Sequence, residues 1–163
     1  MSMSNKKKGL MGLAAAAVIT IATPMVMDSE GLRTKAYLDP VGIPTHCFGE
    51  TLGVKMGDVA TVQECTEQLQ KRLGGFLAEM RACTTVALPP KTEAAFLSFT
   101  YNLGSGVYCE NMAKKRINLG KVKAACDAML LYNKATKDGK RVVLPGLVRR
   151  RQEERAMCLE GLK

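Results

Sequence analysis

The sequence predicts an α+β fold that is predominantly helical, with a small β-hairpin lobe and a larger helical lobe. Apolar residues recur at helical spacing in most of the chain, as at Leu69, Leu73, Leu77 and Met80. Residues 39–57 are instead rich in Gly, Pro and Thr, which is typical of turns between short strands. Because 163 residues, 47% of them apolar, suffice for one core, we expect two lobes joined by a long helix.

The N-terminus carries a segment that is able to enter a membrane. Lys6, Lys7 and Lys8 precede an uncharged run over residues 9–27. At about 1.5 Å per residue, this run is just long enough for a bilayer core of about 30 Å. Its Leu, Ile and Val residues favour insertion by only about 2 to 4 kcal/mol, and the Gly, Thr and Pro residues offset part of that. The run can therefore enter a bilayer and can also leave it.

Three interpretations of the run stay open: an uncleaved signal-anchor, a cleaved signal peptide and a buried core helix. Pro24 and the lack of a small-x-small site near Met27 disfavour cleavage, and a core helix does not need the lysine tract. We therefore expect a signal-anchor over residues 1–27 and one folded domain over residues 28–163. The positive-inside rule places the lysines in the cytoplasm and the domain in the periplasm.

The six cysteines agree with an oxidising compartment. No two of them have the CxxC or CxxxC spacing of a zinc site, so we expect disulfides and no metal. Six cysteines allow fifteen pairings, and the spacing alone does not choose among them.

The net charge of +9 at pH 7 predicts a polyanionic partner, which is a nucleic acid, an anionic membrane surface or an acidic polymer of a cell envelope. The sequence contains no helix-turn-helix or zinc-finger pattern, and phosphate contacts of a periplasmic domain would lie on the wrong side of the membrane. We therefore expect no nucleic-acid partner.

The folded domain is expected to begin with a short helix over residues 30–37. Asp28 and Ser29 are good N-terminal helix residues, and Asp39-Pro40 stops the helix. Residues 39–57 then form the β-hairpin region. A helix over 61–83 is expected to open with a capping box of Thr61 and Glu64. A second helix, over 93–103, is expected to be capped by Thr92 and ended by Gly104. Three further helices are expected over 111–119, 121–132 and 146–159, and a polar turn at 137–140 separates the last two.

Two acidic residues near the hairpin are candidates for glycosidase chemistry. A glycosidase needs one carboxylic acid that protonates the leaving oxygen and one carboxylate that activates water or attacks the sugar. Glu30 and Asp39 are near enough along the chain to face one another across a cleft, and the hydroxyl of Thr45 is available to hold a water. As isolated residues, however, both acids are explained more simply as solvated surface groups.

The residues around these acids strengthen the catalytic interpretation. Three segments stand out: Glu30, Gly31, Leu32, Arg33, Lys35, Tyr37, Asp39, Gly42, Thr45, Gly49 and Thr51; then Ala95, Phe96, Phe99, Tyr101, Asn102, Gly104 and Gly106; and last Gly146, Leu147, Arg150, Arg151 and Glu154. They resemble the catalytic segment, the helix across the cleft and the C-terminal helix of the phage lysozymes, glycoside hydrolase family 24. The resemblance covers the chain from about Asp28 to its end.

The resemblance implies a lysozyme-like fold and an endolysin that hydrolyses the β-1,4 bond between N-acetylmuramic acid and N-acetylglucosamine of peptidoglycan, without a cofactor. It implies Glu30 as general acid, Asp39 as the base that activates water, and Thr45 as a residue that positions this water. The family inverts the sugar configuration, so we expect a carboxyl separation wide enough for a water. The expected substrate-binding residues are Tyr101, Asn102 and Arg150, and Arg150 is expected to orient Glu30 unless it belongs to a solvated basic face.

The resemblance also bears on the cysteines. Cys47–Cys65 and Cys126–Cys158 resemble the positions of disulfides in relatives, which leaves Cys83–Cys109 as the third pair.

Membrane-tethered members of the family, the signal-arrest-release endolysins, resemble this chain at its N-terminus. They stay inactive until the membrane segment is released. We therefore expect this chain to be held at the host inner membrane and then released to the periplasm, with a phage holin as a functional partner. The expected oligomeric state is a monomer. One version cages a catalytic residue through a thiol in that segment, but residues 9–27 contain no cysteine. Because Glu30 follows the run by three residues, we expect a topological lock instead.

The alternative function is that of a non-enzymatic, membrane-active lysis protein. The apolar run and the net charge would suffice for it. It leaves the carboxylate segment unexplained.

Overall fold

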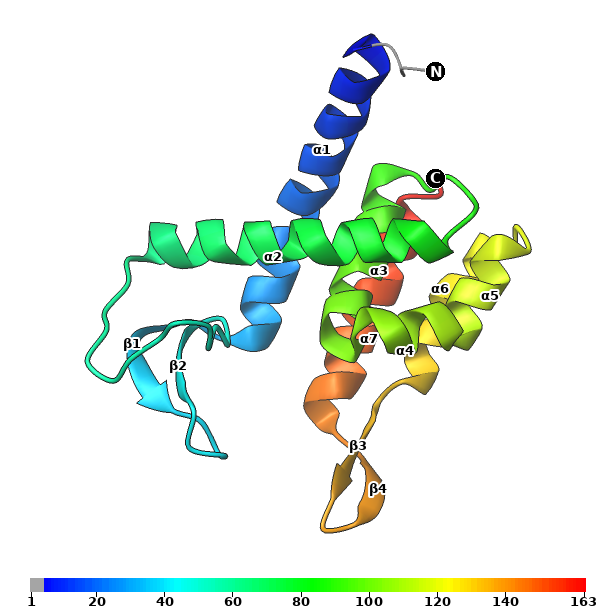
Figure 1. The fold of residues 1–163 in the computed structure, drawn as a ribbon. Coiled ribbons are helices and arrows are strands. Elements are labelled where there is room, and N and C mark those ends of the chain that lie inside the picture. The colour runs from blue at the N-terminus through cyan, green and yellow to red at the C-terminus, as the bar shows by residue number, and fades with distance from the viewer. Residues whose placement is uncertain (1–4) are drawn as a thin grey trace.

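The computed structural model describes residues 5–163 and shows two lobes joined by a long helix (Figure 1). Helix α2 (Val62–Cys83) runs from the smaller lobe to the larger one, and helix α1 (Asn5–Glu30) crosses it. The other elements are β1 (Arg33–Leu38), β2 (Pro44–Cys47), α3 (Pro90–Leu103), α4 (Ser105–Glu110), α5 (Met112–Asn118), α6 (Val122–Ala128), the 3₁₀ turn η1 (Met129–Leu131), β3 (Lys134–Lys137), β4 (Lys140–Val143) and α7 (Pro145–Glu160).

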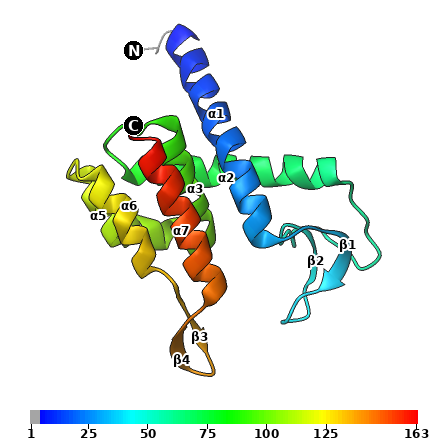
Figure 2. The ribbon, with the colours of Figure 1, turned by 180° about the vertical axis from the view of Figure 1, so that it is seen from behind.

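The smaller lobe, here called the β-lobe, is built on the antiparallel pair β1–β2 and the loops around it. The larger lobe, the α-lobe, is built around α3, which packs against both α1 and α7. Seen from behind, α1 and α7 lie on the same side of the molecule (Figure 2). The predicted α+β, predominantly helical class is therefore confirmed.

Helix α2 follows the pattern that predicted it. The hydroxyl of Thr61 accepts from the backbone N–H of Glu64 at 3.1 Å, and the Glu64 carboxylate accepts from the backbone N–H of Thr61 at 2.6 Å. The predicted capping box is thus present and fixes the start of the helix. The apolar stripe of Leu69, Leu73, Leu77 and Met80 is buried, as its spacing requires.

The short helix predicted over residues 30–37 is wrong. Helix α1 instead continues to Glu30 and ends there, because Gly31 takes a φ of +73° and its N–H bonds back to the carbonyl of Met27 at 3.1 Å. The following strand β1 alternates exposed Arg33 and Lys35 with half-buried residues, which is the period of a strand. Asp28 and Ser29 therefore lie in the last turn of α1.

The interior of the α-lobe differs from the prediction at the start of α3. Pro90 occupies the first turn of α3, where its missing N–H costs nothing, so Thr92 is not the cap. The Thr92 hydroxyl instead donates to the carbonyl of Cys158 at 2.9 Å and ties α3 to the end of α7. Gly104, with a φ of +88°, ends α3 as predicted.

Three further features were not predicted as such. Residues 134–143 form a second hairpin, β3–β4, whose two-residue turn consists of Asp138 and Gly139, both with positive φ. The predicted helix over 121–132 is divided into α6 and η1, and α4 was not predicted.

The second half of the uncharged N-terminal run packs into the core of this structure. Val18, Ala22 and Val26, spaced four residues apart on one face of α1, are at most 1% exposed. Among the described residues, no helix is both long enough and apolar enough to span a bilayer. The side chains of residues 5–13 lie outside the described set, and so do residues 1–4.

Three disulfides cross-link the fold, one between the β-lobe and α2 and two within the α-lobe. Cys47–Cys65 joins β2 to α2, Cys83–Cys109 joins the end of α2 to α4, and Cys126–Cys158 joins α6 to α7. They are the three pairs that the sequence analysis expects.

Substitution of Gly161 by Ala should destabilise the fold. A Cβ at Gly161 would lie 2.6 Å from the backbone nitrogen of Thr92, which α3 holds in place. We expect the free energy of unfolding to fall by about 1 to 3 kcal/mol, as for other overpacked positions, measured by denaturant titration of the oxidised protein. The control is Gly75→Ala in α2, where a Cβ meets nothing within 4 Å. Equal effects of both substitutions would contradict the packing of α7 against α3.

Candidate active site

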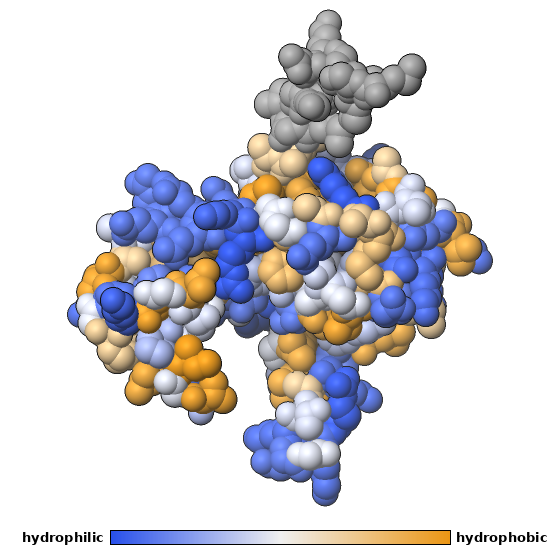
Figure 3. Space-filling model, viewed as in Figure 1, coloured by the Kyte–Doolittle hydropathy of each residue, from blue (hydrophilic) through white to orange (hydrophobic). Residues whose placement is uncertain are grey.

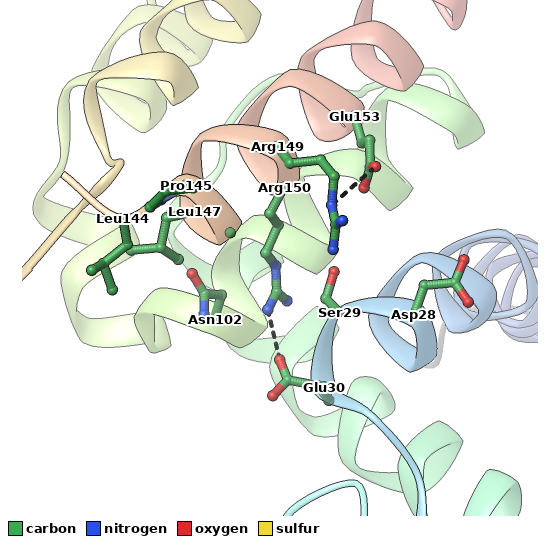
Figure 4. A pocket seen from close by; sticks show the side chains of 11 residues that line it. Asp28, Ser29, Glu30, Asn102, Leu144, Pro145, Leu147, Arg149, Arg150 and Glu153 are labelled. Carbon is green, nitrogen blue, oxygen red and sulfur yellow. Dashed lines mark hydrogen bonds and ion pairs between the residues drawn. The ribbon is translucent and has the colours of Figure 1, made fainter.

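Glu30 lies where α1 ends between the two lobes (Figures 1 and 2). The surface is indented there, between the β-lobe and the projecting β3–β4 hairpin (Figure 3). The Glu30 side chain is 27% exposed and lines an open pocket of about 780 Å³, whose other walls come from α3 and from the first turns of α7 (Figure 4). A carboxyl group in this position is accessible to a ligand and partly shielded from water.

Arg150 of α7 holds the Glu30 carboxyl group. Its Nη1 donates to Glu30 Oε1 at 2.7 Å, across 120 positions of sequence, and its side chain is 7% exposed. The arginine expected beside Glu30 is therefore found there, and the alternative of a solvated basic face is wrong for Arg150. Arg149, the preceding residue, is by contrast 75% exposed at the edge of the same pocket and pairs loosely with Glu153 at 3.9 Å (Figure 4).

A buried ionic cluster supports Arg150 from behind. Glu154 and Arg151 are both fully buried and form an ion pair at 2.7 Å, and Glu154 also accepts from Ser98 Oγ of α3 at 2.8 Å. Burial raises the pKa of Glu154, and the charges of Arg151 and Arg150 oppose that rise. Burial likewise lowers the pKa of Arg151, whose guanidinium also stacks on the Phe99 ring at 4.9 Å.

The two other expected catalytic residues lie in the β-lobe. Asp39 begins the loop between β1 and β2, where its Oδ1 accepts from the backbone N–H groups of Val41 and Ile43, each at 2.9 Å. These bonds fix the carboxylate and leave Oδ2 without a partner among the described residues. Thr45 in β2 is 3% exposed, and its hydroxyl donates to the carbonyl of Ile43 at 2.9 Å.

The structure does not bring these three residues into direct contact. No hydrogen bond within residues 5–163 joins Asp39 or Thr45 to Glu30, and neither residue lines the Glu30 pocket. The acid and the proposed base thus stand on different lobes, one at the end of α1 and the other in the β1–β2 loop.

The expected sugar-binding residues differ in their placement. Asn102 lines the same pocket as Glu30 (Figure 4). Tyr101 turns toward α2, where its ring lies 5.1 Å from that of Phe76 and 5.4 Å from the guanidinium of Arg72. Burial raises the pKa of Tyr101, opposed by Arg72. Its neighbours Phe96 and Phe99 are fully buried core residues.

The sequence analysis missed part of the site. Leu144 and Pro145, which form part of the pocket wall, were not singled out, and neither was Ser98. One available signal was the i, i+4 spacing of Arg150 and Glu154 on a single helix face. Among the described residues, no group of three or more His, Cys, Asp or Glu is placed to hold a metal ion.

A comparison with protein-family models decides the family. The phage lysozyme model matches residues 27–154. The chain belongs to the phage lysozyme family. Among relatives of this phage lysozyme, a SAR-endolysin of Pseudomonas phage phiKMV is 39% identical over 153 residues, which cover 94% of this chain and 92% of that protein.

Solved structures agree with this family. The muramidase domain of SpmX from Asticaccaulis excentricus superposes with a TM-score of 0.80 at 26% identity and covers 85% of this chain and 94% of that one. An endolysin from Escherichia coli O157:H7 phage FAHEc1 superposes with a TM-score of 0.79 at 30% identity and covers 86% of this chain and 91% of that one. The phage lysozyme described here is accordingly an endolysin and a lysozyme-type glycosidase, which confirms the expected family and leaves the non-enzymatic alternative without support.

Removal of the Arg150 guanidinium should destabilise this phage lysozyme. The Arg150→Met substitution leaves buried Glu154 with one fewer cation, so we expect a loss of about 3 kcal/mol in the free energy of unfolding. The control is Arg149→Met, which breaks only a surface pair and should cost less than about 1 kcal/mol. Thermal and denaturant unfolding of both variants measures the difference. Equal stability of the two variants would show that Arg150 is not part of a buried ionic cluster.

Proposed function

We propose that this phage lysozyme hydrolyses the β-1,4 bond between N-acetylmuramic acid and N-acetylglucosamine of peptidoglycan, with Glu30 as general acid and Asp39 as general base. One observation carries the proposal: Glu30 faces an open pocket at the junction of the lobes and is fixed there by a buried arginine. A surface acid without a function would not need such support from a helix 120 positions away.

Glu30 donates its proton to the glycosidic oxygen as the bond to the sugar carbon breaks. Its side chain is 27% exposed and Arg150 binds Oε1, so Oε2 is the oxygen available to carry and donate the proton. Because Glu30 is held in one orientation, less entropy is lost when the reactive geometry forms.

Asp39 and Thr45 hold and activate the attacking water from the β-lobe. The two backbone N–H groups at Oδ1 keep Asp39 oriented, and its free Oδ2 takes a proton from the water as the water oxygen attacks the sugar carbon. Because the Thr45 hydroxyl hydrogen is engaged with Ile43, its oxygen acts on the water as an acceptor. A water that attacks from the face opposite the leaving oxygen produces inversion at that carbon.

The rest of the pocket binds the glycan. Asn102 offers an amide beside Glu30, and residues 144–147 offer a partly apolar wall for a sugar ring. We further propose that Tyr101 borders the sugar site from α3 and that Arg150 contributes to substrate binding only by orienting the Glu30 side chain. The net charge of +9 favours association with the acidic polymers of the envelope. The reaction needs no cofactor.

The Glu30→Gln variant should lose turnover without losing the fold. Glutamine retains an oxygen that accepts from Arg150 but cannot donate the required proton, so we expect a fall of at least about a hundredfold in kcat. The assay is clearing of purified peptidoglycan with analysis of the new reducing ends. The Glu110→Gln variant, in which an exposed acid of α4 is changed, is the control. Undiminished activity of Glu30→Gln, or release of glucosamine reducing ends by the wild type, would refute the proposal.

We also propose that the chain is first held at the host inner membrane by residues 9–27 and then released to the periplasm, with a phage holin as the trigger and a monomer as the active form. Support comes from the lysine tract followed by the uncharged run, and from relatives that bear the name SAR-endolysin. The weak apolar character of the run favours reversible insertion.

The packing of α1 supports a topological lock. Val18, Ala22 and Val26 are core residues in this structure and cannot lie in a bilayer at the same time. Because Glu30 is the last residue of the same helix, its approach to Arg150 depends on where α1 lies. Membrane insertion would therefore keep the acid away from its site, and release would let the site assemble.

A more apolar run should delay activation without harming the enzyme. Ala16, Ala17 and Thr20 lie on the exposed face of α1, so their replacement by Leu leaves the core intact but strengthens membrane insertion. We expect the triple variant to stay in the membrane fraction and to delay lysis, with and without a holin. Purified and free of membranes, it should cleave peptidoglycan at the wild-type rate. Full activity of the membrane-retained variant would refute the lock.

A further inference from the structure

The guanidinium of Arg150 is held on three sides. Nε donates to Glu154 Oε1 at 3.2 Å, Nη2 donates to the carbonyl of Ser98 at 3.3 Å, and only Nη1 points to Glu30. Because the guanidinium is planar and rigid, the first two bonds determine the direction of the third. Glu154 is itself fixed, since Ser98 Oγ donates to it at 2.8 Å and Arg151 Nη2 at 3.0 Å.

The contact between Arg150 and Glu30 creates a chemical conflict. A guanidinium at 2.7 Å favours the ionised form of a carboxyl group. A general acid must however keep its proton until the glycosidic bond breaks. An arginine that only supplied positive charge would orient Glu30 and at the same time disable it.

The charges around Arg150 resolve this conflict. Glu154 lies on the side of the guanidinium away from the pocket, has a side-chain exposure of 0% and is therefore little screened by water. Its negative charge reduces the positive potential that Arg150 exerts on Glu30. The other titratable groups that border Glu30 or the cluster are Asp28 of α1, Tyr101 of α3, and Arg149, Arg151 and Glu153 of α7.

We propose that Glu154 is a positioning residue of the active site, which fixes Arg150 toward Glu30 and shares its positive charge, so that Arg150 orients the acid without keeping it ionised. This inference rests on the proposed role of Glu30 as general acid. Glu154 does not touch the pocket and acts only through Arg150.

The pH profile of the Glu154→Gln variant tests the charge. Glutamine still offers an acceptor to Arg150 Nε but lacks the negative charge. The positive charge of Arg150 therefore favours the ionised form of Glu30 more strongly in this variant than in wild type. The alkaline limb of kcat/KM on purified peptidoglycan, which reports the general acid, should move to lower pH by about one unit at constant ionic strength. KM should stay unchanged. The control is Glu160→Gln on the same helix, whose exposed carboxylate pairs with Lys91.

The Arg151→Gln variant tests the opposite sign. It removes the second cation of the cluster and leaves Glu154 paired with Arg150, so the alkaline limb should move to higher pH. If Glu154→Gln does not fold, the Arg151→Gln variant still tests the inference, because Glu154 keeps Arg150 as a partner in it. A wild-type alkaline limb in every variant that folds would overturn the inference and leave the cluster a purely structural role.

The same assays separate this inference from the proposed function. If wild type cleaves peptidoglycan, Glu30→Gln does not, and the alkaline limb is the same in all cluster variants, only the role of Glu154 fails. If Glu30→Gln is as active as wild type, the proposed function fails and the inference fails with it.

Discussion

The proposed active site depends on one contact, the hydrogen-bonded ion pair between Glu30 and Arg150. It joins the last residue of the first helix to the last helix of the chain, so it exists only when both helices pack on α3. The pair thereby makes the chemistry conditional on the complete fold. The buried surroundings of Arg150 fix the direction of its guanidinium, because each of its three nitrogens donates to an acceptor.

Helix α1 packs in the core and, under the proposed membrane tether, has a second purpose that constrains the first. Its apolar face must then be sufficiently hydrophobic to enter a bilayer and sufficiently compact to pack against α2 and α3. Small residues such as Ala22, together with Val18 and Val26, meet both demands, because they pack closely in the core and favour the membrane only weakly. Gly31 then ends the helix at Glu30, the residue proposed as general acid, which couples the position of the helix to the position of this carboxyl group.

Local signals were predictable from the sequence, and long-range contacts were not. The capping box of α2 and the glycine that ends α3 depend on neighbouring residues, and both predictions were confirmed. The helix over 30–37 was predicted wrongly because its polar N-terminal residues outweighed the signal of Gly31. The turn at 137–140 was predicted, but the strands β3 and β4 on either side of it were not. The approach of Arg150 to Glu30 came from the resemblance to a family, since no periodicity links residues 120 positions apart.

The central claim is that Glu30 and Asp39 act on one glycosidic bond from opposite lobes. A crystal structure of the Glu30→Gln variant with a bound peptidoglycan tetrasaccharide tests it most directly. The account predicts a glycosidic oxygen within hydrogen-bond distance of the side chain at position 30, and a water that bridges the Asp39 carboxylate and the Thr45 hydroxyl beneath the sugar carbon. A tetrasaccharide bound in the same pocket with its scissile bond away from position 30, or with no room for a water before Asp39, would contradict it.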